Sequence, residues 1–442
     1  MKRVAFSKLV VWKEKKGRKP LLLKGTRQVG KTYLLKELGK NVFPRYHYLN
    51  FEENSRLASV FEADLSPERI LKELSFQLDA SIDPRKDLLI FDEIQECPRA
   101  LTSLKYFAET MPELALCGAG SLLGIKLADA SFPVGKVEFL DLYPLSFEEF
   151  LQGIEDTRAI SFLQEYRLQE PIPEVVHSHL WSRLLHYFVV GGLPEAVNTF
   201  REHQDDSYTA MEKVRKLQRS LVLAYLADMA KHAGKQNSMH LERLWRNIPA
   251  QLARTQNGSA SKFRFKDAVP GIGGYERLSG TIDWLLGAGL ILKASMVNSG
   301  LLPFSAYIKE TFFKLYVFDV GMLGVLSQLP PKLVLDYRYG TYKGYFAENF
   351  VAQEFVGSEV TPLVYWKENT AEVEFLRENN GNVYPIEVKS GWVTHSKSLK
   401  VFADKYHPPF RIIMSARNIS IDPARKLIHY PLYLAGRFPL KG

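Results

Sequence analysis

Short apolar runs separated by stretches of helical spacing dominate the first third of the chain. The runs at 21–23, 88–91 and 114–117 are apolar at every position, which is typical of strands buried on both faces of a parallel sheet. Residues 46–51 are rich in aromatic side chains and predict another strand, as do residues 136–140. The segments between the runs place apolar residues three or four positions apart, as helices do. This alternation predicts an α/β domain.

The middle of the chain is mostly helical in its spacing. Residues 147–235 predict several helices, one of which ends at a turn containing Gly191 and Gly192. Residues 239–325 resemble a winged helix, because a helix near 276–286 is accompanied by two apolar runs that fit flanking strands. That helix carries only one positive charge, Arg277, whereas helices that read DNA usually carry several. The element therefore fits contact with a protein as well as contact with DNA.

The strongest chemical signal follows the first apolar run. Residues 25–32 (GTRQVGKT) show the spacing G-x4-G-K-T between a predicted strand and a predicted helix. The glycines let the backbone turn its N–H groups toward phosphate oxygens, and the positive end of the helix adds to the attraction. Lys31 is expected to reach the β- and γ-phosphates of ATP, and the Thr32 hydroxyl to bind Mg²⁺. The predicted nucleotide-binding residues are Gly25, Thr26, Arg27, Gln28, Val29, Gly30, Lys31, Thr32 and Tyr33.

Two acids come directly after the buried run at 88–91. Asp92 and Glu93 would lie at the carboxyl end of a parallel strand, the edge where open α/β sheets bind ligands. Asp92 is expected to hold the hydration shell of Mg²⁺, and Glu93 to orient and deprotonate an attacking water. Ser121 follows the next strand, where it would contact the γ-phosphate or that water. Lys31, Glu93 and Ser121 are therefore the predicted catalytic residues of an ATPase.

Composition limits the number of domains, the kinds of partner and the cellular compartment that we expect. The chain has 442 residues, enough for about three domains. Its net charge of +9 favours DNA or RNA as a partner only weakly, because a solvated basic surface explains it as well. Cys97 and Cys117 form no paired motif, which favours buried thiols in a reducing cytosol. No apolar run is long enough to cross a bilayer, so we expect a cytoplasmic protein without a membrane partner.

Three segments together resemble a known family. The motif at 25–32, the strand and acid pair at 88–95, and residues 142–147 (LYPLSF) are similar to those of bacterial and archaeal AAA-type ATPases. In that family the ATPase module is fused to a C-terminal domain of uncharacterised role. The resemblance covers almost the whole chain and implies a five-stranded parallel sheet, with the P-loop strand next to the acid-pair strand. It also implies a helical lid over the nucleotide.

The sequence departs from that family at Lys136, where an arginine is usual. A lysine supplies charge but not the bidentate fork of an arginine finger, so the finger stays unassigned. A finger supplied by a second copy of the chain would explain a homo-oligomer.

Charged residues near the C-terminus resemble the PD-(D/E)xK nuclease core. A helix at 344–351 presents Glu348, and a strand at 371–376 carries Glu374. After a hairpin turn at 379–381, the next strand carries Glu387 and Lys389, which the period of two places on one face. Glu348, Glu374 and Glu387 are expected to bind Mg²⁺, and Glu387 and Lys389 to act on the attacking water or the transition state. Glu374 stands where the family usually has Asp, so both cleavage and binding without cleavage stay open.

The predicted fold class is α/β, in four domains. They are an AAA-type P-loop ATPase domain (1–150) with a parallel sheet, a helical lid or linker (151–238), a winged-helix middle domain (239–325) and an α/β restriction-endonuclease-like, or nuclease-like, domain (326–442). The main hypothesis is an ATPase that controls a domain interacting with nucleic acid. The alternative is a nucleotide-dependent switch or scaffold, in which the winged helix binds a protein and the C-terminal acids are structural.

Overall fold

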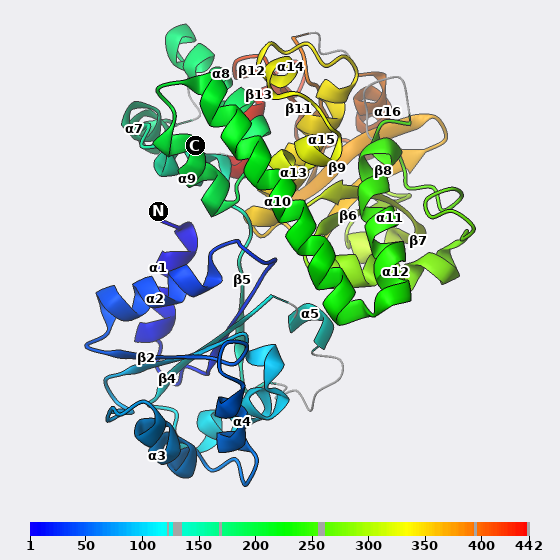
Figure 1. The fold of residues 1–442 in the computed structure, drawn as a ribbon. Helices are drawn as coiled ribbons and strands as arrows, with labels where there is room; N and C mark the ends of the chain where they lie inside the picture. The colour runs from blue at the N-terminus through cyan, green and yellow to red at the C-terminus, as the bar shows by residue number, and fades with distance from the viewer. Residues whose placement is uncertain (122, 127–134, 168–169, 255–260, 393–395, 440–442) are drawn as a thin grey trace. The chain divides into compact units, whose positions relative to one another are not determined.

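The computed structural model describes residues 1–121, 123–126, 135–167, 170–254, 261–392 and 396–439 (Figure 1). It divides into two compact units. The first contains Met1–Tyr143 and Gly287–Gly289, and the second contains Pro144–Leu286 and Leu290–Gly442. Each unit is built around its own β-sheet.

The first unit holds a five-stranded sheet in which every pairing is parallel. Its strands are β1 (Leu21–Lys24), β2 (Tyr46–Asn50), β3 (Leu88–Asp92), β4 (Ala115–Gly120) and β5 (Glu138–Asp141). Its helices are α1 (Val4–Glu14), α2 (Lys31–Val42), α3 (Pro67–Gln77), α4 (Pro98–Thr110) and α5 (Leu123–Lys126), with 3-10 turns η1 (Ser55–Phe61) and η2 (Ile94–Glu96). The expected parallel sheet is therefore confirmed.

The strand order is β2-β3-β4-β1-β5, which corrects one expectation. The P-loop strand β1 does not lie next to the acid-pair strand β3, because β4 pairs with both of them. Where β4 pairs with β1, Gly118 leaves room for the Leu22 side chain, since a Cβ atom on Gly118 would lie 2.6 Å from it. The order brings the end of β4, and hence Ser121, between the P-loop and the acid pair.

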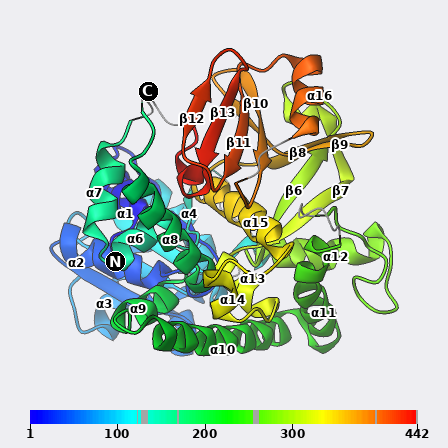
Figure 2. The same cartoon turned by 90° about the horizontal axis from the view of Figure 1, so that it is seen from above.

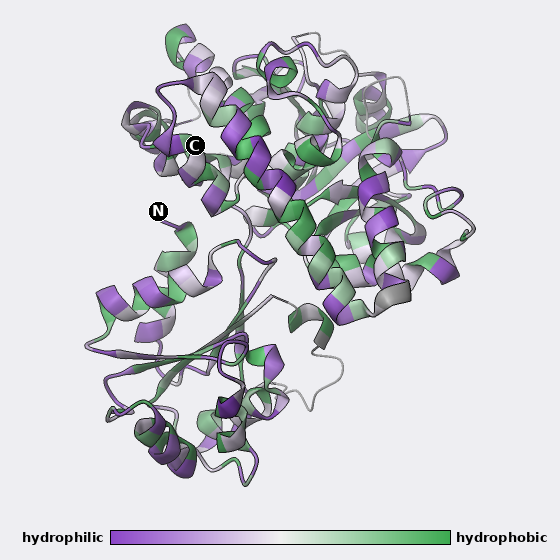
Figure 3. Ribbon diagram, viewed as in Figure 1, coloured by the Kyte–Doolittle hydropathy of each residue, from purple (hydrophilic) through white to green (hydrophobic). Residues whose placement is uncertain are grey.

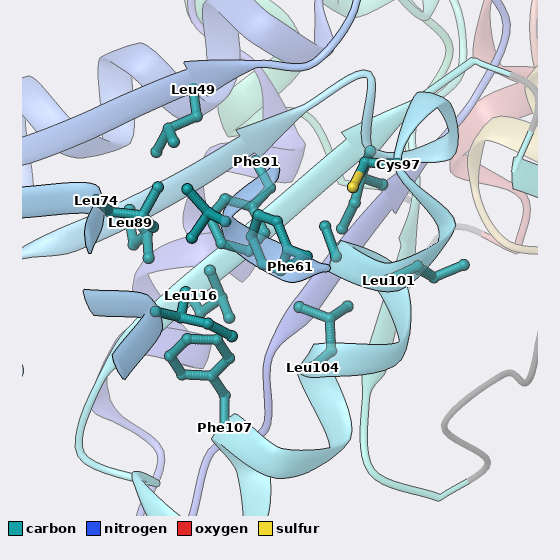
Figure 4. Packing of buried hydrophobic residues seen from close by; sticks show 14 of the residues in the cluster. Leu49, Phe61, Leu74, Leu89, Phe91, Cys97, Leu101, Leu104, Phe107 and Leu116 are labelled. Carbon is teal, nitrogen blue, oxygen red and sulfur yellow. The ribbon is translucent and has the colours of Figure 1, made fainter. Parts of the chain in front are cut away.

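The sheet of the first unit is covered on both faces. Helices α1 and α2 lie on one face, and α3, α4 and η1 lie on the other (Figure 1). The second face buries a continuous apolar core that includes Leu89, Leu104 and Phe107 (Figure 4). Phe61 and Phe91 meet edge to face within it, with ring centroids 5.8 Å apart. Cys97 and Cys117 are both buried free thiols, as the sequence suggested.

The second unit holds the remaining elements. Its helices are α6 (Phe147–Gly153), α7 (Thr157–Glu165), α8 (Glu174–Val190), α9 (Pro194–Glu202), α10 (Ser207–Ala233), α11 (Lys235–Leu252), α12 (Tyr275–Gly287), α13 (Val320–Leu326), α14 (Pro331–Leu335), α15 (Tyr342–Gly357) and α16 (Lys397–Tyr406), with 3-10 turns η3 (Phe304–Tyr307) and η4 (Leu432–Arg437). Its strands are β6 (Ile291–Val297), β7 (Ile308–Val317), β8 (Leu363–Glu368), β9 (Ala371–Asn379), β10 (Asn382–Val388), β11 (Arg411–Ser415), β12 (Ser420–Asp422) and β13 (Leu427–Pro431).

One mixed sheet in the second unit crosses a predicted domain boundary. Its order is β12-β13-β11-β10-β9-β8-β6-β7, and β6 pairs with β8 in parallel, with Ala294 opposite Leu363. The two strands expected to flank a winged helix within 239–325 therefore form one edge of the sheet predicted for 326–442. The sequence pattern identified the strands but not their partners, because buried apolar strands look alike whichever neighbour they pair with.

Helices cover both faces of this sheet (Figure 2). Helix α15 packs on β7, β8 and β10, and α16 packs on β9 and β10 from the opposite side. Every residue of α15 from Tyr345 to Val356 is buried, because α13 and η4 cover its outer side. The outer helices α10 and α11 instead carry both hydrophilic and hydrophobic positions (Figure 3). Within the described residues, no helix has the length and apolar character needed to cross a membrane.

The turn at Gly191 and Gly192 does more than end α8. Asp319 caps α13 by accepting a hydrogen bond from the Met322 amide (3.0 Å), and it accepts a second one from the Gly192 amide (2.6 Å). A Cβ atom on Gly191 would lie 2.2 Å from the Asp319 carboxylate. Burial raises the pKa of Asp319 to about 6, against the effect of these hydrogen bonds. Gly191 is therefore needed for the close approach of this buried acid.

Candidate nucleotide site and C-terminal charge cluster

The loop between β1 and α2 has the curled backbone that its glycines predict. Gly25, Gln28 and Gly30 all have positive φ angles, of 148°, 66° and 94°. A Cβ atom on Gly25 would lie 2.2 Å from the Leu142 carbonyl oxygen, so glycine is required there. Arg3 supports the loop from outside by donating a hydrogen bond to the Val29 carbonyl (2.9 Å).

Lys31 lies at the centre of this loop. Its side chain is only 6% exposed, and its Nζ donates to the carbonyl oxygens of Gly25 and Thr26, each at 2.9 Å. An ammonium group has three N–H donors, so among the described residues one is left for a phosphate oxygen. Burial lowers the pKa of Lys31 to about 8, although the nearby carboxylates of Glu93 and Asp92 act in the opposite direction.

Asp92 joins the loop to the neighbouring strands. Its Oδ2 accepts hydrogen bonds from the hydroxyls of Thr32 (2.7 Å) and Tyr48 (2.8 Å). Burial and the bond to Asp92 raise the pKa of the Tyr48 phenol, so it stays a donor at neutral pH. Asn50, which pairs with Asp92 across the sheet, donates to the Tyr48 hydroxyl (3.3 Å). The sequence analysis missed Tyr48, although its place near the carboxyl end of β2 was a usable signal.

Glu93 and Ser121 occupy neighbouring positions at the same sheet edge. Glu93 has a left-handed backbone (φ 47°), and its carboxylate accepts a hydrogen bond from the Gln95 side chain (2.5 Å). Gln95 is buried over Gly120, where a Cβ atom would lie 2.1 Å from its amide oxygen. Ser121 accepts a hydrogen bond from Arg27 Nε (3.3 Å), which ties it to the P-loop. Gln95, which no sequence pattern marks, thus fixes the orientation of the Glu93 carboxylate.

The remaining predicted residues are less central. Thr26 and Val29 are buried within the loop, whereas Tyr33 is half exposed and contacts the N-terminal amine (3.2 Å). Lys136 is ion-paired with Glu109 of α4 (3.0 Å).

These features fit a nucleoside triphosphate with Mg²⁺. The loop supplies amides and a buried ammonium, and the Thr32–Asp92 pair supplies the oxygen ligands that Mg²⁺ prefers. Together with the parallel sheet, they define a P-loop NTPase fold.

Comparison with family models assigns the first unit more narrowly. Residues 17–151 match the family described as AAA domain, so this part of the chain is an AAA-type ATPase domain. Residues 182–333 and 343–433 match two domains of unknown function, DUF8612 and DUF4143. No curated protein matches the chain.

Several solved structures match this chain at low sequence identity. A Walker-type ATPase of Pyrococcus abyssi is 16% identical with a TM-score of 0.48, over 74% of this chain and 95% of that one. The ORC1 protein of Aeropyrum pernix, solved in complex with DNA, is 15% identical with a TM-score of 0.30, over 75% and 92%. DnaA of Aquifex aeolicus, bound to AMPPCP, is 13% identical with a TM-score of 0.27, over 55% and 78%. The class assignment rests on the family model and on the geometry of the site.

The C-terminal acids lie close together but are all buried. Glu348, Glu374 and Glu387 are each no more than 4% exposed. The carboxyl groups of Glu374 and Glu387 are hydrogen-bonded to each other, and Lys389 Nζ lies 2.6 Å from Glu387 Oε1. Burial, followed by the charge of Glu387, raises the pKa of Glu374 well above its usual range. This shift favours the neutral form of Glu374.

A lysine that the sequence analysis missed lies among these acids. Lys314 on β7 is fully buried, and its Nζ contacts Glu348 Oε1 (3.1 Å) and Glu372 Oε1 (2.8 Å). Burial by itself would lower the pKa of Lys314, but Glu348 and Glu372 raise it well above the ordinary value. Lys314 lies 34 residues before Glu348 in the chain, so no local sequence pattern links the two.

The metal site predicted at Glu348, Glu374 and Glu387 stays a prediction. In the part of the chain that the structure describes, no three His, Cys, Asp or Glu side chains are arranged to hold a metal ion. Glu348 is ion-paired with Lys314 and Glu387 with Lys389, so a metal ion at these carboxylates would compete with two lysines.

Nucleotide binding is expected to take up a proton above pH 8. Free Lys31 has a pKa of about 8, and phosphate oxygens favour its charged form, so binding of ADP with excess Mg²⁺ at pH 8.5 should take up roughly three-quarters of a proton. Titration calorimetry in buffers of different ionisation enthalpy measures this uptake. The same experiment at pH 7 should give only about 0.1 proton. Equal uptake at the two pH values would contradict the assignment.

Replacing Lys314 with methionine is expected to lower the free energy of unfolding by about 3–5 kcal/mol, because it leaves buried Glu348 without its cation. Lys367→Met is the matched control: Lys367 also contacts Glu372 (2.7 Å) but is 35% exposed, so the loss should be below about 1 kcal/mol. Urea unfolding followed by tryptophan fluorescence measures both, since five of the six tryptophans belong to the second unit. Equal losses in the two variants would refute a special role for Lys314.

Proposed function

We propose that this protein is an ATP hydrolase that binds ATP and Mg²⁺ at the P-loop of its first unit. The observation that carries the proposal is the Asp92 oxygen shared by the Thr32 and Tyr48 hydroxyls. It holds a hydroxyl and a carboxylate together beside the buried ammonium of Lys31, as binding of Mg²⁺ and triphosphate requires. When bound, Mg²⁺ neutralises charge on the phosphates and orients them for displacement.

The side chains around this point have distinct roles in the proposal. Lys31 balances charge on the β- and γ-phosphates, and its protonated form is the one that binds. Glu93, held by Gln95, orients a water and takes its proton. Ser121, held by Arg27, contacts the γ-phosphate or that water. Lys136 is engaged with Glu109, so we propose that a charge-stabilising finger comes from a second copy of the chain.

Glu93→Gln is expected to lower kcat for ATP hydrolysis by about 10²- to 10⁴-fold while leaving nucleotide affinity close to that of the wild type, because it removes the base but not the phosphate contacts. Lys31→Ala should instead abolish nucleotide binding. A phosphate-release assay and a fluorescent-nucleotide titration measure the two effects. Glu53→Gln, an exposed acid beside the same sheet edge, is the matched control and should leave both unchanged. ATP hydrolysis at the wild-type rate in both Glu93→Gln and Lys31→Ala would contradict the proposal.

Of the two functional hypotheses, the charge cluster of the second unit favours the nucleotide-dependent switch. Its cluster contains four carboxyl groups (Glu348, Glu372, Glu374 and Glu387) and three lysines (Lys314, Lys367 and Lys389). The three lysines offset the charge of three of the four carboxylates without a metal ion. We therefore propose that the cluster stabilises the fold, and that ATP turnover controls contact with a partner rather than cleavage. A nucleic acid and a protein both remain candidates for that partner.

No cleavage of single- or double-stranded DNA or RNA is expected with Mg²⁺ or Mn²⁺, with or without ATP, because Lys314 and Lys389 are ion-paired with two of the three carboxylates that a metal ion would need. Electrophoresis of labelled substrates after incubation with wild type and Lys389→Ala measures this. Cutting by the wild type that Lys389→Ala loses would restore the nuclease hypothesis. Turnover measured in the same samples identifies the partner: stimulation by DNA or RNA favours a nucleic acid, and no stimulation favours a protein.

A further inference from the structure

The second unit contains a cavity far along the chain from the P-loop and outside the charge cluster. It has a volume of about 550 Å³, within the usual range for small-molecule sites. Helices α10 and α11 supply part of its wall, and the end of α13 with the start of α14 supplies the rest. Helices α11, α13 and α14 all pack on α10 (Figure 2). The cavity therefore lies within one unit and needs no other part of the chain.

A buried arginine with two unpartnered nitrogens lines this cavity. Arg215 is 2% exposed, and its Nη1 donates to Gln218 Oε1 (2.8 Å) and to the Gly321 carbonyl (3.1 Å). Its Nε and Nη2 atoms are buried and have no hydrogen-bond partner among the described residues. These two atoms form one edge of the guanidinium, the edge that binds a carboxylate or phosphate through two parallel hydrogen bonds.

The surrounding helices hold this side chain in place. Gln218 donates to the carbonyl oxygens of Val189 (2.9 Å) and Val190 (3.0 Å) at the end of α8, so its amide cannot turn away from Arg215. Gly324 leaves space for the guanidinium, since a Cβ atom there would lie 2.9 Å from Arg215 Nη2. The orientation of Arg215 is therefore set by the fold and does not depend on a ligand.

The charge around the cavity is positive. Arg219 and Arg246 line it together with Arg215, against one acid, Glu212. Arg246 is ion-paired with Glu242 (2.8 Å), whereas Arg219 lies on an exposed part of α10 one turn from Arg215. Burial lowers the pKa of Arg215 to about 10, with a further contribution from Arg219. A buried cation that lacks a full set of partners is costly, and a bound anion would remove that cost.

The rest of the lining is apolar. Val222 and Leu326 contribute side chains, and Pro330 and Pro331 contribute rigid rings. A fully hydrated inorganic ion would leave these surfaces in contact with water, whereas an organic body would cover them. We propose that this cavity is a binding site for an organic anion, whose carboxylate or phosphate head binds the Nε–Nη2 edge of Arg215 and whose apolar body packs on these side chains. Nothing in this inference depends on ATP hydrolysis.

Titration calorimetry of the full-length protein with phenyl phosphate, benzoate and inorganic phosphate tests the site. At least one of the two aromatic anions should bind more tightly than inorganic phosphate, and the preferred head group distinguishes the two ligand classes. Each titration is repeated with ADP and Mg²⁺ present, because competition would locate the binding at the P-loop instead. No binding of either aromatic anion, or full competition by ADP, would overturn the proposal.

Variants then locate the binding. Arg215→Lys keeps the charge but loses the fork, and affinity should fall by about tenfold or more. Arg219→Ala alters an exposed side chain, so it should fold even if Arg215→Lys does not, and affinity should fall by about two- to fivefold. Arg243→Ala, an exposed arginine of α11 outside the lining, is the matched control and should leave affinity unchanged. Affinity in Arg219→Ala equal to that in the control would count against the site.

Discussion

A charge that folding removes from water must be balanced inside the protein, and three buried cations show how this constraint organises the structure. Lys31 is held by two backbone carbonyls of its own loop, Lys314 lies between two glutamates, and Arg215 is bonded along only one part of its guanidinium. The energetic cost of an unpaired buried charge is several kcal/mol, comparable with the whole stability of a domain. Each cation therefore indicates either a satisfied structural contact or a site for an anion.

The geometry of the two sheets decides which charges meet. In the first unit, β4 lies between β1 and β3, so the P-loop, Ser121 and the acid pair end at one edge of the sheet. In the second unit, the pairing of β6 with β8 brings β7, and with it Lys314, into the sheet that carries Glu372 and Glu374. The first arrangement collects groups that fit a phosphate ligand and a metal ion. The second places an internal ammonium among carboxylates, where it is ion-paired with Glu348 and Glu372.

The site in the first unit was largely predictable, and the limits of that prediction have a physical cause. Eight consecutive residues carry the P-loop, and Asp92 follows its own buried strand, so both signals are local. The hairpin turn was local too, with Asn380 and Gly381 at φ angles of 51° and 77°. No local motif marks Tyr48 or Gln95. Tyr48 acts through a residue of the neighbouring strand, and Gln95 is placed by its packing over Gly120. The predicted winged-helix strands were strands, but they belong to a different sheet.

The sequence by itself determined where the buried strands lie, which loop would turn its amides toward phosphate and which acids follow the central strand, because backbone conformation and apolar periodicity are set by neighbouring residues. Only the tertiary structure decided that β4 separates β1 from β3, that Lys314 pairs with Glu348 and Glu372, and that Arg215 lines a cavity with two nitrogens that lack a partner among the described residues. Those outcomes depend on contacts between segments distant in the chain. Such contacts are selected by the packing and charge balance of the whole fold, which no local pattern records.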